Sequence, residues 1–142
     1  MSSTNIDDIG FLLAKAAQRF NELLLERFAK AGYPKVRASH GSVLVPLFAR
    51  DELRLGEIAS EARLSKQAMT SLVRQCEELD LVERSRDPED GRAFRVALTA
   101  RGRHFRVVAE RAMTEIDEQV VAVLGVRKRN ALIEALRGVM DL

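Results

Sequence analysis

The spacing of apolar residues changes twice along this 142-residue chain, and these changes constrain its fold more than any other feature. Over residues 6–31, apolar side chains recur every three or four positions, which predicts a long amphipathic helix that ends at Gly32-Tyr33-Pro34. Residues 53–98 predict two short helices and then two strands that alternate around the loop 87–91. Helical spacing resumes near Ala100 and, after a break at Gly125, continues through Met140.

A shorter helix is predicted from Ser39 to about Ala49, with Ser39 as its N-cap. Pro46 is expected to kink or shorten that helix, because proline has no N–H to donate. The central unit is too small to cover the apolar faces of the two terminal helical regions, so these regions are expected to pack on each other and on a second copy of the chain. We therefore expect one mostly α (α+β) domain over residues 1–142.

Composition argues against several classes of protein. The chain is 46% hydrophobic and 31% charged, which suits a globular domain, and its formal charge of +2 does not by itself indicate a nucleic-acid partner. With one cysteine and two histidines, we expect no disulfide, metal or cofactor. The polar start MSSTNIDDIG and the lack of a long apolar run predict a cytoplasmic protein without a targeting signal or membrane span. The sequence has no paired carboxylates in a plausible cleft, no nucleophile beside a base and no glycine-rich phosphate loop, so we do not expect an enzyme.

Residues 55–72 have the apolar pattern of two helices that cross steeply. The expected buried positions are Leu55, Ile58, Ala59, Ala62, Leu64, Met69 and Leu72. Ala59 is small enough to let the helices approach, and Ser65 is placed to cap the second one. The turn position that often holds glycine is Arg63, so the turn must accommodate a side chain. This pattern predicts a helix-turn-helix.

The predicted second helix, residues 65–79, separates into an apolar and a polar face. Its inward stripe contains Met69, Leu72, Val73, Cys76 and Leu79, and its outward face contains Lys66, Gln67, Thr70, Ser71 and Arg74. Between Arg63 and Cys76 there are three basic residues and no acid, whereas acids crowd the far end. Such side chains bond phosphates and base edges, so this half is predicted to enter a major groove of DNA. The alternative is an ordinary solvated helix surface.

Arginines gather in the predicted hairpin, residues 81–99, and in the residues just after it. Seven arginines oppose three acids between positions 84 and 106, a balance of +4. The alternation places Phe94, Val96 and Leu98 on one face, around an exposed tip. Arginine at a hairpin tip suits a narrow minor groove, so Arg86, Arg92 and Arg95 are predicted DNA contacts. The alternative is that these arginines are solvated and paired with the three acids of the loop.

The segment SKQAMTSLVRQCEELDLVERSRDPEDGRAFRVALTARG resembles the helix-turn-helix and wing of the MarR family of bacterial transcriptional regulators. In that family's wing pattern, an Asp and an Arg two positions apart precede a strand that ends in Leu-Thr. The pattern is present here as Asp90, Arg92, Val96, Leu98 and Thr99. The resemblance implies a winged-helix core over residues 36–99 and dimerisation helices over 6–31 and 100–142.

The resemblance also implies a homodimer that offers one winged helix to each half of a pseudo-palindromic operator. In such a protein Asp90 braces the wing arginine, Arg92, and residues 65–74 enter the major groove. The charge pattern and the resemblance select the same DNA contacts: Ser65, Lys66, Gln67, Thr70, Ser71, Arg74, Arg86, Asp90, Arg92 and Arg95.

A pocket between the dimerisation helices and the winged domain is a further implication of the resemblance, often occupied by small aromatic or amphipathic acids. The effector-binding candidates are Phe11, Lys15, Arg19, Phe20, His40, Leu44 and Phe105. Arg19 is a candidate partner for a ligand carboxylate, and the alternative is a surface charge on a long helix. Cys76 lies on the inward stripe, so we expect it to pack in the core rather than sense oxidants.

The expected function is that of a DNA-binding transcriptional regulator, a homodimeric repressor that a small-molecule effector releases from its operator in the cytoplasm, at the nucleoid. Two alternatives stay open. One is a winged-helix scaffold for protein interactions without specific DNA binding, and the other is a DNA-binding activator or architectural protein.

Overall fold

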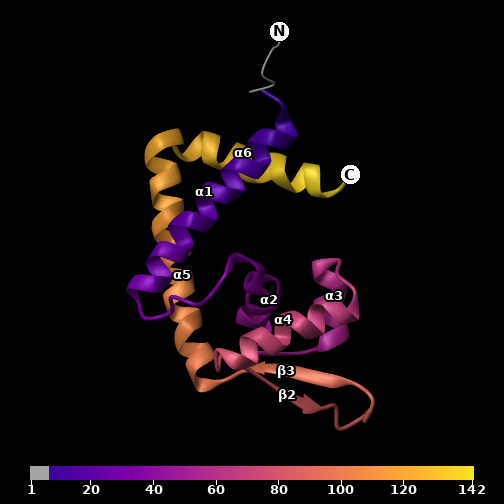
Figure 1. Ribbon diagram of the computed structural model, residues 1–142. Helices are drawn as coiled ribbons and strands as arrows, with labels where there is room; N and C mark the ends of the chain where they lie inside the picture. The colour runs from indigo at the N-terminus through magenta and orange to yellow at the C-terminus, as the bar shows by residue number, and fades with distance from the viewer. Residues whose placement is uncertain (1–6) are drawn as a thin grey trace. The chain divides into compact units, whose positions relative to one another are not determined.

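The computed structural model describes residues 7–142, which divide into two compact units (Figure 1). One unit contains Leu25–Ala109, and the other contains the chain up to Leu24 together with Glu110–Leu142. The helices are α1 (Ile9–Lys30), α2 (Gly41–Arg50), α3 (Leu55–Ala62), α4 (Lys66–Glu78), α5 (Ala100–Leu124) and α6 (Val126–Met140), with a 3-10 turn, η1, at Ala38–His40. The strands are β1 (Glu52–Arg54), β2 (Val82–Arg86) and β3 (Phe94–Leu98). The predicted mostly α fold with a small β component is confirmed.

Helix α1 ends where the sequence predicted. Gly32 adopts a left-handed φ of +101°, and the N–H of Tyr33 donates to the carbonyl of Phe28 across 2.8 Å. A residue with a side chain is disfavoured at such a φ, which is why glycine closes the helix here. The predicted start of this helix at Ile6 lies outside the described residues.

Helix α2 differs from its prediction at its first residues. Ser39 is not an N-cap, because it lies inside η1, and α2 begins two residues later at Gly41 with His40 in the cap position. The chain therefore makes one 3-10 turn before the α-helix starts. A prediction based on the first residue able to cap a helix does not detect such a turn. Pro46 lies inside α2, and the helix continues past it to Arg50.

The sheet has three antiparallel strands in the order β1-β3-β2. The sequence predicted the hairpin of β2 and β3 but missed β1, because three residues are too few for an alternating pattern to be recognised. Leu53 is paired with Val96 on the buried face, whereas Arg54 is paired with Arg95 on the opposite face. The hairpin lies beside α4 (Figure 1).

The core of the Leu25–Ala109 unit joins the helix-turn-helix to the sheet. Its fully buried members include Val43, Leu47, Ile58, Met69, Val73, Cys76, Leu81 and Val96. The rings of Phe28 and Tyr33 each pack edge-on against Phe105 with centroids 4.8 Å apart. Burial of Leu64 was predicted wrongly: this side chain is 38% exposed, because it falls in the turn between α3 and α4 rather than on either helix. Ala62, Leu72 and Leu79 are half-buried.

The other unit contains helices with many exposed apolar side chains. No residue of α6 is buried, and the exposed set in this unit includes Ile9, Phe11, Leu12, Leu13, Phe20, Val123, Val126, Leu132, Val139 and Met140. Gly125, at φ +84°, separates α5 from α6. Arg129 of α6 donates two hydrogen bonds, of 2.8 and 2.9 Å, to the carboxylate of Asp117 in α5. Among residues 7–142, no helix is both long and apolar enough to cross a membrane.

Candidate nucleic-acid interface

The turn between α3 and α4 is built around a left-handed arginine. Arg63 has φ 56° and ψ 41°, and the next N–H, of Leu64, donates to the carbonyl of Ala59 across 3.0 Å. This is the position where the sequence predicted that a side chain would have to be accommodated. The bond closes the C-terminus of α3 and lets α4 start within a few residues, so the predicted helix-turn-helix is confirmed.

Ser65 caps α4 as predicted, because its hydroxyl oxygen accepts from the N–H of Ala68 across 3.1 Å. The buried stripe of α4 then turns the polar residues outward. Lys66, Gln67, Ser71 and Arg74 are exposed, and Thr70 is half-buried with its hydroxyl donating to the carbonyl of Lys66. The first turn of α4 contains no acid, so the positive end of the helix dipole and the side chains add to one electropositive surface.

A groove of about 490 Å³ lies between the start of α4 and the β2–β3 hairpin. Lys66 and Thr70 line it from α4, and Arg84, Asp90, Arg92, Ala93 and Phe94 line it from the hairpin. The first residues of α3 and Arg54 complete its wall. The structure thus brings predicted contacts from two separate segments to one concave surface. Arg54 was missed by the sequence analysis, since it lies outside both predicted motifs.

Two arginines lie over the ring of Phe94, which lines this groove. The guanidinium carbons of Arg84 and Arg86 lie 5.4 and 5.5 Å from the centre of its ring, which is within the range of cation–π attraction. Arg84 also pairs with Glu77 of α4 across 2.9 Å, and Arg86 donates to the carbonyl of Gly91. Phe94 is 36% exposed, whereas Val96 and Leu98, predicted on the same face, are buried.

The hairpin loop holds Arg92 through its backbone. The Asp90 carboxylate accepts from the N–H of Arg92 across 3.1 Å, so the acid orders the main chain beside the arginine. The side chain of Arg92 is exposed and lines the groove. The resemblance had implied that Asp90 braces Arg92, and the observed brace acts on the peptide N–H.

Asp87, one of the three loop acids that the sequence offered as partners for the hairpin arginines, is buried. Its Oδ1 accepts from the N–H of Glu89 across 2.9 Å, and its Oδ2 lies 2.7 Å from Arg54 Nε and 3.6 Å from Arg95 Nε. The Glu89 N–H lowers the pKa of the Asp87 carboxyl most; burial opposes this effect, and the charges of Arg54 and Arg95 add to the lowering. Arg95, a predicted DNA contact, is therefore engaged in ion pairs.

The effector candidates fall into two groups that belong to different units. Phe11, Lys15, Arg19 and Phe20 are exposed on α1, with Lys15 Nζ 5.7 Å from the Phe11 ring centre and Arg19 paired with Glu22. His40, Leu44 and Phe105 are buried in the Leu25–Ala109 unit.

Both ring nitrogens of His40 are engaged. Nδ1 accepts from the N–H of Arg37 across 2.9 Å, and Nε2 lies 2.9 Å from Gln75 Oε1 on α4. An accepting Nδ1 assigns the proton to Nε2, so the network implies a neutral imidazole that donates to Gln75. His40 thus joins η1 to the far half of α4.

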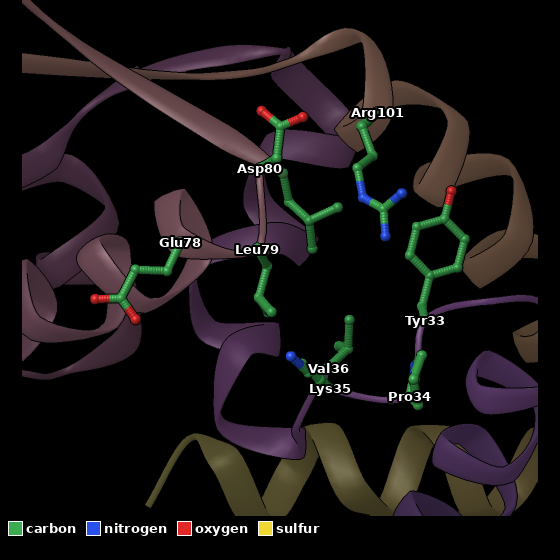
Figure 2. A pocket seen from close by; sticks show the side chains of 9 residues that line it. Tyr33, Pro34, Lys35, Val36, Glu78, Leu79, Asp80 and Arg101 are labelled. Carbon is green, nitrogen blue, oxygen red and sulfur yellow. The ribbon is translucent and has the colours of Figure 1, made fainter.

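A pocket of about 440 Å³ that the sequence did not predict lies at the C-terminal end of α4 (Figure 2). Its walls come from the segment after α1, the turn after α4 and the start of α5, and Figure 2 shows Arg101 and Tyr33 on one side with Glu78 on the other. The Arg101 guanidinium lies 4.8 Å from the centre of the Tyr33 ring, and the Tyr33 hydroxyl lies 2.6 Å from His104 Nδ1. The pocket is lined by apolar side chains and by side chains of both charges.

Cys76 is fully buried on the inner face of α4. Burial, with a smaller contribution from the neighbouring Glu77 carboxylate, raises the pKa of its thiol to about 12. The thiolate is the reactive form, so this environment fits the predicted packing role.

Comparison with known proteins shows the same architecture. The chain is 26% identical over 101 residues to an uncharacterised HTH-type transcriptional regulator, YdgJ, of Bacillus subtilis (strain 168), a match that covers 71% of this chain and 62% of that protein. It is similar in fold to the transcriptional repressor CouR bound to a 23-mer DNA duplex, with a TM-score of 0.83, 24% identity and coverage of 99% and 98% of the two chains. It is also similar to the PcaV regulator of Streptomyces coelicolor in complex with its natural ligand, with a TM-score of 0.81, 18% identity and coverage of 99% and 97%.

Residues 47–93 match the sequence model of the MarR family, and this segment contains the helix-turn-helix and the wing loop described above. The three-stranded winged helix, the curated relative and the family match agree with one another. The chain is thus similar to the MarR family over its helix-turn-helix and wing loop, and similar in fold over nearly its whole length.

Proposed function

We propose that this protein is a transcriptional regulator that binds duplex DNA through α4 and the β2–β3 wing. The observation that carries the proposal is that Lys66 and Arg92, from two separate segments, line one groove beside an acid-free helix start. A helix N-terminus with lysine, glutamine, threonine and serine side chains suits a major groove, and an exposed loop arginine suits the adjacent minor groove. The DNA-bound state of the similar CouR structure supports the same use of this fold.

The functional species in this proposal is a homodimer that represses transcription from a pseudo-palindromic operator. The apolar side chains left exposed on α1 and α6 are the surface that a second copy would cover. Two recognition helices about 34 Å apart enter successive major grooves on one side of the duplex. A small change in dimer geometry is therefore enough to weaken binding.

Release by a small aromatic or amphipathic effector completes the proposal. The similar PcaV structure was solved with its natural ligand, which supports a ligand-responsive regulator. The candidate ligand residues stay those predicted from the sequence, with the exposed Arg19 as the partner for an acidic group. We also include Arg101, which is one of the residues that line the pocket in Figure 2.

The test is fluorescence anisotropy of the purified protein with DNA from upstream of its own gene and with a scrambled duplex, across a salt series. We expect tighter binding to the upstream DNA and a steep decrease of affinity with salt, because each neutralised phosphate releases counterions. Equal, weak binding to both duplexes would contradict sequence-specific regulation. Absence of binding to either duplex at low salt would overturn the proposal and favour a protein-interaction scaffold.

A further inference from the structure

One face of the small sheet brings like charges together. The register pairs Arg54 of β1 with Arg95 of β3, so two guanidinium groups extend from directly opposite positions on the same face. Like charges in this relation destabilise a sheet unless an anion lies between them. Glu52 is 4.0 Å from Arg95 and is half exposed, which makes it a weak counter-charge.

Asp87 supplies the missing anion from the end of β2. Its side chain is 0% exposed, and its Oδ2 is the atom that approaches both arginines. The lowered pKa of this carboxyl means that it is ionised at neutral pH. A buried carboxylate is stable only when paired, so these three side chains depend on one another.

The three residues connect the wing to the helix-turn-helix. Asp87 is the first residue of the loop, and its N–H donates to the carbonyl of Ala93 across 3.0 Å, which closes the segment that carries Arg92. Arg54 is the N-cap residue of α3, and its N–H donates to Glu57 Oε1 across 3.0 Å. A contact between Asp87 and Arg54 therefore joins the base of the wing to the start of α3.

We infer that Asp87 is a positioning residue for DNA binding: with Arg54 and Arg95 it forms a clamp that holds the wing at a set distance from α4. This inference rests on the proposed function, in which Arg92 and Lys66 bind DNA from the two sides of the groove. The clamp would set the distance between these two residues. Arg95 then acts through Asp87 rather than through a contact with DNA.

Because Asp87 is an acid, the inference can be tested by whether its removal weakens or strengthens DNA binding. Removing an acid from a DNA-binding surface raises its positive potential and, by itself, strengthens binding. A clamp role predicts the opposite for Asp87→Asn. The matched control is Glu89→Gln, which removes the same charge two residues away from a side chain that is 81% exposed and 3.7 Å from Arg54.

The experiment measures anisotropy with the same duplex and, without DNA, hydrogen exchange of the loop 87–93 by mass spectrometry. We expect Asp87→Asn to bind roughly tenfold more weakly, the loss of one good groove contact, and to exchange faster in the loop. Glu89→Gln is expected to bind as tightly as the natural protein or more tightly, with unchanged exchange. If Asp87→Asn binds as well as Glu89→Gln, or if its loop exchange is unchanged, the inference is overturned.

A second variant guards against misfolding of Asp87→Asn, which a thermal melt followed by circular dichroism would reveal. Arg54→Lys keeps the charge but replaces the nitrogen that lies 2.7 Å from the carboxylate, so it should also weaken binding and speed exchange in the loop. Natural affinity and exchange in Arg54→Lys would overturn the clamp. If the natural protein binds no duplex, the proposed function fails by itself, and the exchange measurement still tests whether the clamp holds the wing.

Discussion

The hydroxyl of Thr99 donates a hydrogen bond to the backbone carbonyl of Asp80 across 2.6 Å. The same oxygen accepts from the N–H of Gly102 across 2.9 Å, so Thr99 also occupies the N-cap position of α5. Its own N–H donates to the carbonyl of Leu81 across 3.0 Å. One residue therefore ties the segment that leaves α4 to the start of α5, which gives a physical reason for the Leu-Thr that ends the wing pattern.

Replacing Thr99 by alanine should lower the free energy of unfolding by about 1–2 kcal/mol, because the helix loses its cap and the Asp80 carbonyl loses its donor. Thr99→Ser is the control, since it keeps the hydroxyl and should recover most of the loss. Urea denaturation followed by circular dichroism at a constant protein concentration measures both. Equal stability of the alanine and serine variants would show that the hydroxyl does not hold this junction.

Gly102→Ala should be more harmful than loss of the cap. A Cβ at Gly102 would lie 2.0 Å from the carbonyl oxygen of Leu81, so the backbone must move, at a cost of about 2–3 kcal/mol in unfolding free energy. Gly56→Ala is the matched control in the same unit: its Cβ would meet only Lys66 Cε at 3.9 Å, and alanine is the better helix former. The two melting temperatures, measured by differential scanning calorimetry, should move in opposite directions. A Gly102→Ala variant as stable as the natural protein would contradict the close approach.

Cys76 should be inert in the folded protein. Burial raises the pKa of its thiol to about 12, so the thiol is protonated at pH 8. A colorimetric thiol reagent at pH 8 should therefore label Cys76 only after unfolding in urea. Labelling of the folded protein within minutes would contradict the buried position. The peptide containing Cys76, identified by mass spectrometry, confirms the site of reaction.

The same thiol should make stability fall at high pH. Its pKa is raised from 9.0 in its ordinary state to about 12 in the fold, so the unfolded chain releases the proton first. The stability that depends on the protonated thiol is complete below pH 9 and is lost as the pH rises toward 12. Urea midpoints measured from pH 8 to pH 11 should fall more steeply for the natural protein than for Cys76→Ala. Parallel curves would show that the thiol does not contribute.

Arg92→Ala should weaken DNA binding and reduce the slope of log affinity against log salt by about 1, the change expected for one lost phosphate contact. Arg127→Ala, at an exposed position of α6, removes the same charge away from the groove and should leave the slope unchanged. Anisotropy titrations of both variants across a salt series make the comparison. An unchanged slope in Arg92→Ala would remove the wing tip from the interface.

Local patterns were enough to predict most helices and the hairpin. Gly32 and Ser65 act through the backbone within a few residues of themselves, and their roles were predicted correctly. The sequence also predicted that the turn at Arg63 must accommodate a side chain, and the structure shows that it does so with a left-handed backbone. The polar face of α4 follows from the 3.6-residue period, which places buried and exposed residues without knowledge of any partner.

Contacts between distant segments were outside the reach of such patterns. Strand β1 is three residues long and is a strand only because β3 lies beside it. The exposure of Leu64 depends on where the crossing of α3 and α4 leaves the turn, and the exposed ring of Phe94 depends on two arginines that lie over it.

The sequence by itself determined the helical periods, the Ser65 cap, the helix-turn-helix and the acid-free first half of α4, because each of these depends on neighbours within about one or two turns of chain. Only the tertiary structure decided that Asp87 is buried and that its partners are Arg54 and Arg95. The physical reason is that a buried charge is stable only beside an opposite one, and those partners arrive from two other strands when the sheet closes.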